Sequence, residues 1–270
     1  MPDPDPLDPA PQNPASPEDR ARAAMEQARR DLLAARAGLL EALRTERGRR
    51  RGLLNQRLHE IKRMLVPDSG HASQAGQDRA VDRILGGLTG GVFADVGGYD
   101  GITGSNTLFF EQRRGWTGLL VEPAPDKLAA ARALRRCPCL GVAVAAEEGE
   151  AQFLEVAAGY TQMSGLVDSY DPGLLSQVRA DPRHREVLRQ VPTRPLAAIL
   201  DEAPRTPDFV SLDIEGGEVA ALSVFPFARH PVRVWAIENN ARSPEIRRIM
   251  EAAGHRLVEF CGQDEIWTKT

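Results

Sequence analysis

The sequence predicts an α/β fold in which helices cover both faces of a mainly parallel, doubly wound sheet. Beyond Pro67 short apolar runs alternate with helix-like segments, a glycine-rich turn follows the first run, and two apolar runs close the chain as a hairpin. The expected parallel strands are 92–96, 118–122, 139–144, 208–213 and 233–238. The expected helices are 105–113, 125–136, 218–224 and 243–253, and the closing strands 256–261 and 265–269 are joined by the turn 262–264.

The first strand runs into a glycine-rich turn that is suited to binding a nucleoside cofactor. An acid near the end of the strand is followed by three glycines, which let backbone N–H groups approach a ligand closely. Polar side chains that can cap a helix come next, and an acid that ends the second strand can accept both hydroxyl protons of a ribose. The residues predicted to bind the cofactor in this way are Asp95, Gly97, Gly98, Gly101, Ser105, Asn106, Thr107 and Glu122.

The spacing of the glycines favours one of two cofactor classes. A dinucleotide site usually carries the pattern G-x-G-x-x-G, which directs a helix N-terminus at a pyrophosphate. The turn from Asp95 to Gly101 reads D-x-G-G-x-x-G, so its third glycine is misplaced for that purpose. S-adenosylmethionine has no phosphate, and its zwitterionic methionine end suits a turn that offers N–H groups and an acid together. We therefore expect S-adenosylmethionine.

A second group of acids follows the fourth and fifth strands. Asp213 ends the fourth strand, which lies beside the first in this topology, so we expect its carboxylate near the reacting end of the cofactor. Asp213, Glu238 and Asn239 would offer three oxygen ligands to a hard cation such as Mg²⁺, which lowers the pKa of a substrate hydroxyl. In a metal-free alternative, Glu215 or a histidine takes the hydroxyl proton as a general base. Asp213 and Glu215 would otherwise only cap the next helix, the role we expect for Glu218.

Composition narrows the class of protein and its location. The chain has 270 residues and a net charge of −4, and no apolar stretch approaches the roughly 20 residues that span a bilayer, so we expect no membrane insertion. The first residues are acidic and rich in proline, unlike a signal peptide. The three cysteines match no common zinc or redox spacing. We therefore expect a cytoplasmic protein with reduced cysteines.

The charge distribution divides the chain into regions. Residues 1–17 are rich in Pro, Asp, Ala and Asn and are predicted to form a disordered tail. Residues 18–66 are predicted to form an N-terminal helical extension, and residues 67–270 the α/β domain. The α/β domain holds 21 Lys and Arg against 28 Asp and Glu, so its partner is expected to be a small molecule and not a nucleic acid.

The helical extension carries a short heptad pattern. Met25, Leu32 and Leu39 are seven residues apart, with an alanine three positions beyond each of them. Such a seam favours a homodimer, and a solvated helix packed on the domain explains it equally well. The arginine-rich run 44–52 interrupts the pattern and is expected to be a solvated face, with contact to phosphate or an anionic surface as the alternative.

Several motifs in order make the chain, from about Ser73 to its end, resemble the FkbM family of S-adenosylmethionine-dependent methyltransferases. The motifs are Ser73–Asp78, Phe93–Gly101, Ser105–Thr107, Gly115–Pro123 and Leu212–Glu218. The resemblance implies a Rossmann-like class I methyltransferase domain over residues 67–270, with a seven-stranded sheet whose last strand is antiparallel. It also implies O-methylation of a hydroxyl on a sugar or natural-product small molecule. Asp95, Gly97 and Glu122 fall on cofactor-binding positions, and Asp213 faces the reacting centre.

The proposed cation site is also similar to that of catechol-type O-methyltransferases, in which two acids and an Asn come from the ends of the same two strands. The chain departs from that pattern at Glu238, which replaces the usual Asp, and at Gly216, where a lysine base would stand. Gln74 and Asp78 match the FkbM motif before the first strand, which places them near the cofactor or the acceptor.

Residues 159–190 match no motif, and an insertion at this point would form a lid over the edge of the sheet that selects the acceptor. A helix pair over 172–188 that only covers the sheet is the alternative. Two other functions remain open, a nucleotide-dependent oxidoreductase on a Rossmann-like sheet and a non-catalytic assembly protein built on the N-terminal helices. The first lacks the phosphate-binding glycine pattern, and the acids Asp95 and Glu122 disfavour the second.

Overall fold

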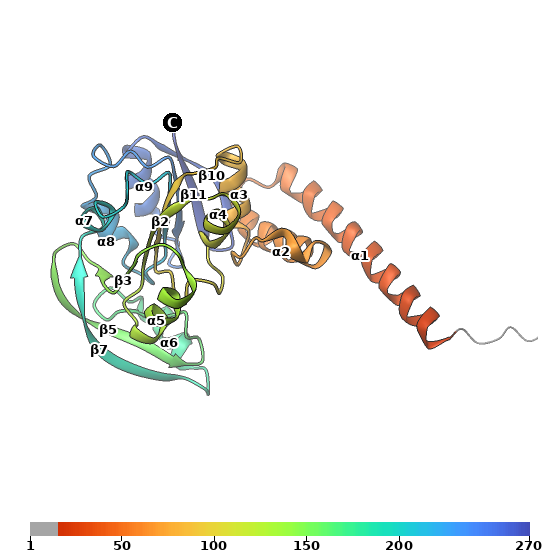
Figure 1. Ribbon diagram of the computed structural model, residues 1–270, viewed down its shortest axis with the longest axis horizontal. Helices are drawn as coiled ribbons and strands as arrows, with labels where there is room; N and C mark the ends of the chain where they lie inside the picture. Colours follow the sequence, from red (N-terminus) through yellow and green to blue (C-terminus); the bar gives the residue numbers. More distant parts are fainter. Residues whose placement is uncertain (1–15) are drawn as a thin grey trace, which may run out of the picture.

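A seven-stranded sheet forms the centre of the protein (Figure 1). The structure is a computed structural model and describes residues 16–270. The strand order is β10-β11-β9-β8-β1-β2-β3, and β11 alone runs antiparallel to its neighbours within this sheet. The predicted doubly wound α/β fold with an antiparallel last strand is confirmed. The strands are β1 (Val92–Val96), β2 (Thr117–Val121), β3 (Cys139–Leu140), β8 (Phe209–Leu212), β9 (Val234–Glu238), β10 (His255–Cys261) and β11 (Asp264–Lys269).

Both faces of this sheet are covered, because successive side chains of a strand point to opposite faces. In β1 every residue is buried, and Phe93 packs with the helix α4 on one face while Ala94 and Val96 join the larger apolar cluster on the other. The helices that follow the extension are α3 (Gln77–Ile84), α4 (Leu108–Arg113), α5 (Pro125–Leu134), α6 (Pro172–Arg179), α7 (Leu196–Leu200), α8 (Glu218–Ser223) and α9 (Pro244–Ala252).

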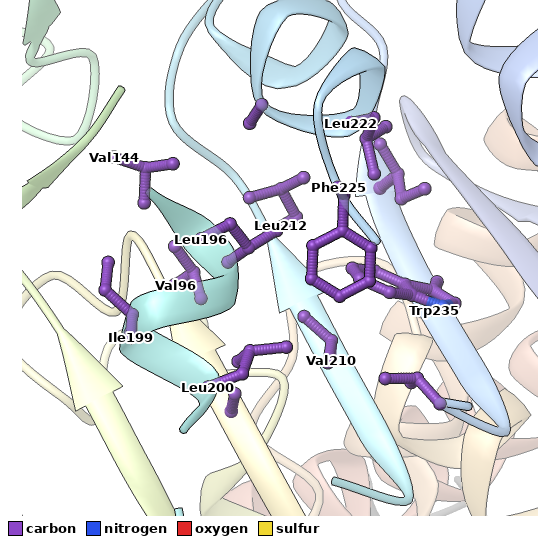
Figure 2. Packing of buried hydrophobic residues seen from close by; sticks show 14 of the residues in the cluster. Val96, Val144, Leu196, Ile199, Leu200, Val210, Leu212, Leu222, Phe225 and Trp235 are labelled. Carbon is purple, nitrogen blue, oxygen red and sulfur yellow. The ribbon is translucent and has the colours of Figure 1, made fainter. Parts of the chain in front are cut away.

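The larger cluster fixes the strands that carry the second group of acids. Leu196 of α7 lies beside Leu212 of β8, and Leu222 of α8 lies toward Trp235 of β9 (Figure 2). Phe225, just after α8, lies edge-on against Trp235 of β9 with 5.2 Å between the ring centroids. Buried aromatic pairs of this kind hold neighbouring elements at a defined spacing. β8 and β9 therefore end at a rigid edge of the sheet.

A second, four-stranded sheet lies beside the first and was not predicted. It contains β4 (Ala143–Val144), β5 (Gly149–Ala158), β6 (Gly165–Leu166) and β7 (Arg185–Arg194) in the order β4-β7-β5-β6. The expected strand 139–144 is split, because only its first part pairs with β2 while its last part pairs with β7. The expected helix pair over 172–188 is wrong beyond α6, because the long antiparallel pairing of β5 with β7 takes up the residues that follow.

The N-terminal helices are α1 (Pro17–Thr45) and α2 (Arg50–Leu65), and a 3₁₀ turn, Pro67–Ser69, leads into the domain. The predicted tail lies outside the described residues except for Ser16, which caps α1, and Pro17, its first residue. α1 extends away from the body and buries no residue (Figure 1). Met25 is 74% exposed, while Leu32 and Leu39 are half-buried.

α2, in contrast, is docked on the closing hairpin. Arg51 donates to both carboxylate oxygens of Glu259 at 2.6 and 2.7 Å, and Arg49 pairs with Glu265. The backbone N–H of Gly262 donates to the carbonyl oxygen of Gly52 at 3.0 Å. The arginine-rich run is therefore not a solvated face throughout, because two of its guanidinium groups anchor α2. Within residues 16–270 we find no helix with both the length and the apolar character needed to cross a membrane.

Candidate active site

A cleft opens at the carboxyl ends of the parallel strands, where the sheet topology predicts a ligand site. It encloses about 1150 Å³, counting the part open to solvent. One side is formed by the glycine turn after β1 and by Glu122, and the other by Asp213, Glu215 and Glu238. Residues of the segment 161–169, between β5 and α6, also line it. Of the predicted cofactor-binding residues, Gly101 and Thr107 do not line the cleft, whereas Asp95, Gly97, Gly98, Ser105, Asn106, Glu122 and Asp213 do.

The glycine turn brings the two sides of the cleft together. Gly97 has a positive φ of 83°, and the N–H groups of Gly97 and Gly98 both donate to the carbonyl oxygen of Val121. A Cβ on Gly97 would collide with the carbonyl oxygen of Asp213. Only glycine meets both requirements at this position, the left-handed backbone and the close approach of a second chain segment.

Asp95 stabilises the turn through hydrogen bonds to two hydroxyl groups that follow it. Its Oδ2 accepts hydrogen bonds from Ser105 Oγ at 3.1 Å and Thr107 Oγ1 at 2.6 Å. Arg135, which has a fully buried side chain, lies 3.4 Å from the same oxygen and forms a second ion pair with Glu111 at 3.1 Å. Ser105 and Thr107 are therefore committed to Asp95, and their hydroxyl protons are not available to a cofactor.

Sequence reasoning missed Arg135, because a single arginine at the end of an expected helix gives no sign that it turns inward. The guanidinium of Arg135 also lies over the ring of Phe93, 5.2 Å from the ring centroid. Buried carboxylates need such a cation, since isolated charges are costly to remove from water.

Glu122 is positioned by two backbone donors. Its Oε2 accepts the N–H of Tyr99 at 2.9 Å, and its Oε1 accepts the N–H of Ala124 at 2.8 Å. Burial raises the pKa of Glu122 to about 7, in spite of these hydrogen bonds. Each carboxylate oxygen can accept a second hydrogen bond. Glu122 can therefore still bind two hydroxyl groups, which is what a ribose presents.

Three carboxylates gather on the other side of the cleft. Asp213, Glu215 and Glu238 each have an oxygen within 4.8 Å of the others. Burial and the charge of Asp264 raise the pKa of Asp213 to about 8. Burial and the charge of Asp213 raise the pKa of both Glu215 and Glu238 well above their usual values. Such a group takes up either protons or a cation, because like charges this close cannot all remain ionised alone.

The structure puts Glu215, and not Asn239, in this group. Asn239 is buried, its Oδ1 accepts the N–H of Ser243 at 2.7 Å, and its Nδ2 donates to Glu265 at 2.9 Å. The amide therefore holds the loop after β9. Glu215 has a positive φ of 55°, a strained backbone for a residue with a side chain, and strain of this kind is concentrated at functional sites. Glu218 accepts the N–H groups of Ile214 and Gly216.

The segment 161–169 is tied to the glycine turn. The hydroxyls of Tyr99 and Thr161 are 2.7 Å apart, and Tyr170 donates to the carbonyl oxygen of Met163 at 2.5 Å. Gln74 lines the cleft. Asp78, which the same motif placed near the ligands, instead accepts the N–H groups of Ala72 and Ser73 and closes its own loop.

A model of the methyltransferase FkbM domain matches residues 95–257, which is more than half of the chain. The chain belongs to the FkbM methyltransferase family. This membership confirms the resemblance and sets aside the oxidoreductase alternative. No curated protein sequence matches the chain.

Three solved structures are similar to this FkbM-family chain at low identity. A methyltransferase FkbM from Methylobacillus flagellatus KT is 15% identical with a TM-score of 0.46, and the alignment covers 87% of this chain and 58% of that one. The chain thus spans little more than half the length of that relative. A TehB-like SAM-dependent methyltransferase from Corynebacterium glutamicum is 13% identical (TM-score 0.38, 80% and 98% covered). A SAM-dependent methyltransferase from Aquifex aeolicus is 12% identical (TM-score 0.34, 77% and 95% covered).

The role of Arg135 leads to a prediction about stability. Arg135→Leu leaves Asp95 and Glu111 buried without their cation, which should lower the free energy of unfolding by about 3–5 kcal/mol. The neighbouring Arg136 is exposed, so Arg136→Leu should change it by less than about 0.5 kcal/mol. Urea unfolding followed by circular dichroism measures both. Equal stability of the two variants would contradict the structural role given to Arg135.

Proposed function

We propose that this FkbM-family protein transfers the methyl group of S-adenosylmethionine to a hydroxyl oxygen of a sugar or natural-product small molecule. The observation that carries the proposal is the placement of Glu122. Its two oxygens face the cleft with one backbone N–H each, opposite a group of carboxylates with raised pKa values. One side of this site can bind a ribose diol, and the other side carries carboxylates. Such a site suits an adenosyl cofactor whose reacting end must lie close to the hydroxyl of the acceptor.

Different residues of the cleft bind the cofactor and take the proton in this reaction. S-adenosylmethionine, when bound, supplies an activated methyl group on a sulfonium. The turn at Gly97 and Glu122 hold the cofactor, and Asp213 or Glu215 takes the proton of the acceptor hydroxyl. A base with a pKa near the working pH is suited to this task, and the pKa of Asp213 is about 8. Orienting the hydroxyl in line with the methyl group can contribute about 7 to 11 kcal/mol.

A divalent cation is the second part of the proposal. We propose that Asp213, Glu215 and Glu238 would hold a Mg²⁺ ion, which would lower the pKa of the acceptor hydroxyl. Three clustered carboxylates match the oxygen ligands that Mg²⁺ prefers. Asn239, part of the ligand set that the sequence indicated, is engaged by Ser243 and Glu265. Without the cation, Asp213 and Glu238 would share a proton and Glu215 or Asp213 would act as the base.

The remaining assignments concern location and assembly. The three cysteine thiols are free, which suits the reducing cytoplasm, where we place the reaction. We also propose that α1 joins two copies of the chain, because its heptad seam keeps Met25 exposed and α1 buries no residue against the domain.

The affinity for S-adenosylmethionine should depend on pH through Glu122. The ionised carboxylate accepts both ribose hydroxyls, so lowering the pH through about 7 protonates it and weakens binding. We expect the dissociation constant at pH 6 to be about tenfold higher than at pH 8, since a proton then occupies most of the carboxylates. Glu122→Gln should bind weakly at both pH values, whereas the exposed Glu150→Gln should behave as wild type.

Isothermal titration calorimetry with S-adenosylmethionine, NAD and ATP makes this measurement and tests the cofactor at the same time. Heat should be released with S-adenosylmethionine alone. If this ligand produces none at pH 8, the proposed function is wrong.

Cation binding can be tested without an acceptor. Mn²⁺, which has similar ligand preferences to Mg²⁺, should bind more tightly as the pH rises through about 8, because protons then leave Asp213. Glu238→Gln should weaken binding at least tenfold, and Glu150→Gln should not. Electron paramagnetic resonance of free Mn²⁺ follows the titration. Equal affinity of wild type and Glu238→Gln would favour the metal-free base.

Sedimentation tests the assembly. Glutamates on the seam, in Leu32→Glu/Leu39→Glu, should convert a dimer into a monomer by burying charge between the helices. Ala34→Glu/Ala37→Glu adds the same charge on another face of α1 and should remain a dimer. A wild-type chain that already sediments as a monomer would rule out the homodimer.

A further inference from the structure

A second cavity opens beside the cofactor cleft. It encloses about 1330 Å³, counting the part open to solvent, and lies between the start of α2, the loop after β9 and the turn that joins β10 to β11. Gln74, Gly104, Asn106, Asp213 and Glu238 line both cavities. Two of the three clustered acids, Asp213 and Glu238, therefore line the second cavity, and a third carboxylate there comes from Asp264.

Arginines from two distant parts of the chain gather at this cavity. Arg49, Arg50 and Arg242 all line it. Arg49 is neutralised by Glu265. Arg50 and Arg242 are exposed, and within residues 16–270 neither guanidinium group has an ion-pair or hydrogen-bond partner. Two unpaired guanidinium groups around one cavity favour an oxyanion, because their planar donors match phosphate oxygens in pairs.

Arg242 is held at this position by a strained loop. It has a positive φ of 53°, although it carries a long side chain, and its N–H donates to the carbonyl oxygen of Asn239 at 3.1 Å. Asn239 fixes the loop further through both amide atoms, which bond to the backbone of Ser243 at 2.7 and 3.1 Å. A strained residue that the surrounding structure enforces is a sign of function. Asn239 is thus a positioning residue for Arg242.

The rest of the lining suits a molecule with several hydroxyl groups. Side-chain amides, which both donate and accept hydrogen bonds, are contributed by Gln56, Gln74, Gln263 and Asn106. Asn106 is 8% exposed and donates to Ser211 at 2.9 Å, but its Oδ1 has no partner. An unpartnered buried acceptor that lines both cavities is a ready site for a hydroxyl donor.

We propose that the second cavity binds the methyl acceptor, and that this acceptor is a phosphorylated sugar or a similar polyhydroxylated phosphate ester. Arg50 and Arg242 hold its phosphate at the mouth, the amides hold its hydroxyls, and the reacting hydroxyl lies beside Asp213. The inference rests on the proposed methyl transfer for its chemistry, but phosphate binding in this cavity is a separate property. Since Arg50 and Gln56 belong to α2, the N-terminal extension forms one wall of the acceptor site.

The test uses inorganic phosphate, titrated by calorimetry into the full chain at constant ionic strength, with and without saturating S-adenosylmethionine. Phosphate should bind in both cases, because the cofactor fills the first cavity only. Arg50→Gln/Arg242→Gln should weaken phosphate binding at least tenfold and leave the dissociation constant for S-adenosylmethionine within twofold of wild type. The control Arg185→Gln/Arg256→Gln removes two other exposed arginines and should bind phosphate as wild type does.

A second titration compares glucose 6-phosphate with glucose. The phosphorylated sugar should bind at least tenfold more tightly than glucose, and the Arg50→Gln/Arg242→Gln variant should lose this preference. Equal phosphate affinity in wild type and that variant, or no phosphate binding to wild type, would overturn the inference while the cofactor titration still reports on the proposed function. Failure to bind S-adenosylmethionine, with phosphate bound normally, would overturn the proposed function alone.

Discussion

The site depends on the close approach of two strand ends. The N–H of Asp213 donates to the carbonyl oxygen of Val96 at 3.0 Å, which extends the pairing of β8 with β1 by one residue. The next residue along β1 must then pass the carbonyl group of Asp213, and only Gly97 leaves room for it. This contact sets the width of the cleft, because Glu122 follows the strand on one side of β1 and the acids follow the strands on the other.

The buried carboxylates near that contact differ in whether a cation neutralises them. Asp95 has a buried cation, Arg135, and two hydroxyl donors. Asp213, Glu215 and Glu238 have no lysine or arginine partner within the described part of the chain, and their pKa values are raised. A carboxylate that is already neutralised serves to hold the structure. Carboxylates left without a cation are the ones able to bind a metal ion or take a proton.

The N-terminal extension shows how three adjacent arginines acquire three environments. Successive residues at the start of a helix point about 100° apart, so neighbouring side chains extend in different directions. Arg49 and Arg51 pair with Glu265 and Glu259 and anchor α2 on the closing hairpin. Arg50, between them, is directed at the second cavity and has no partner in residues 16–270. The anchored helix therefore fixes the backbone from which the side chain of Arg50 extends.

The sequence by itself determined the elements whose signals are local. Apolar runs with an acid at or near the carboxyl end, at Asp95, Glu122, Asp213 and Glu238, mark parallel strands, and the order of such strands puts their ends at one edge of a sheet. Only the tertiary structure decided which side chains meet across long distances in the chain. The pairing of β5 with β7 and the contact of Arg135 with Asp95 join segments about 30 to 40 residues apart in the chain. Glu215 enters the acidic group through a strained turn. Periodicity and spacing report on a residue's neighbours along the chain, and these contacts are made by neighbours in space.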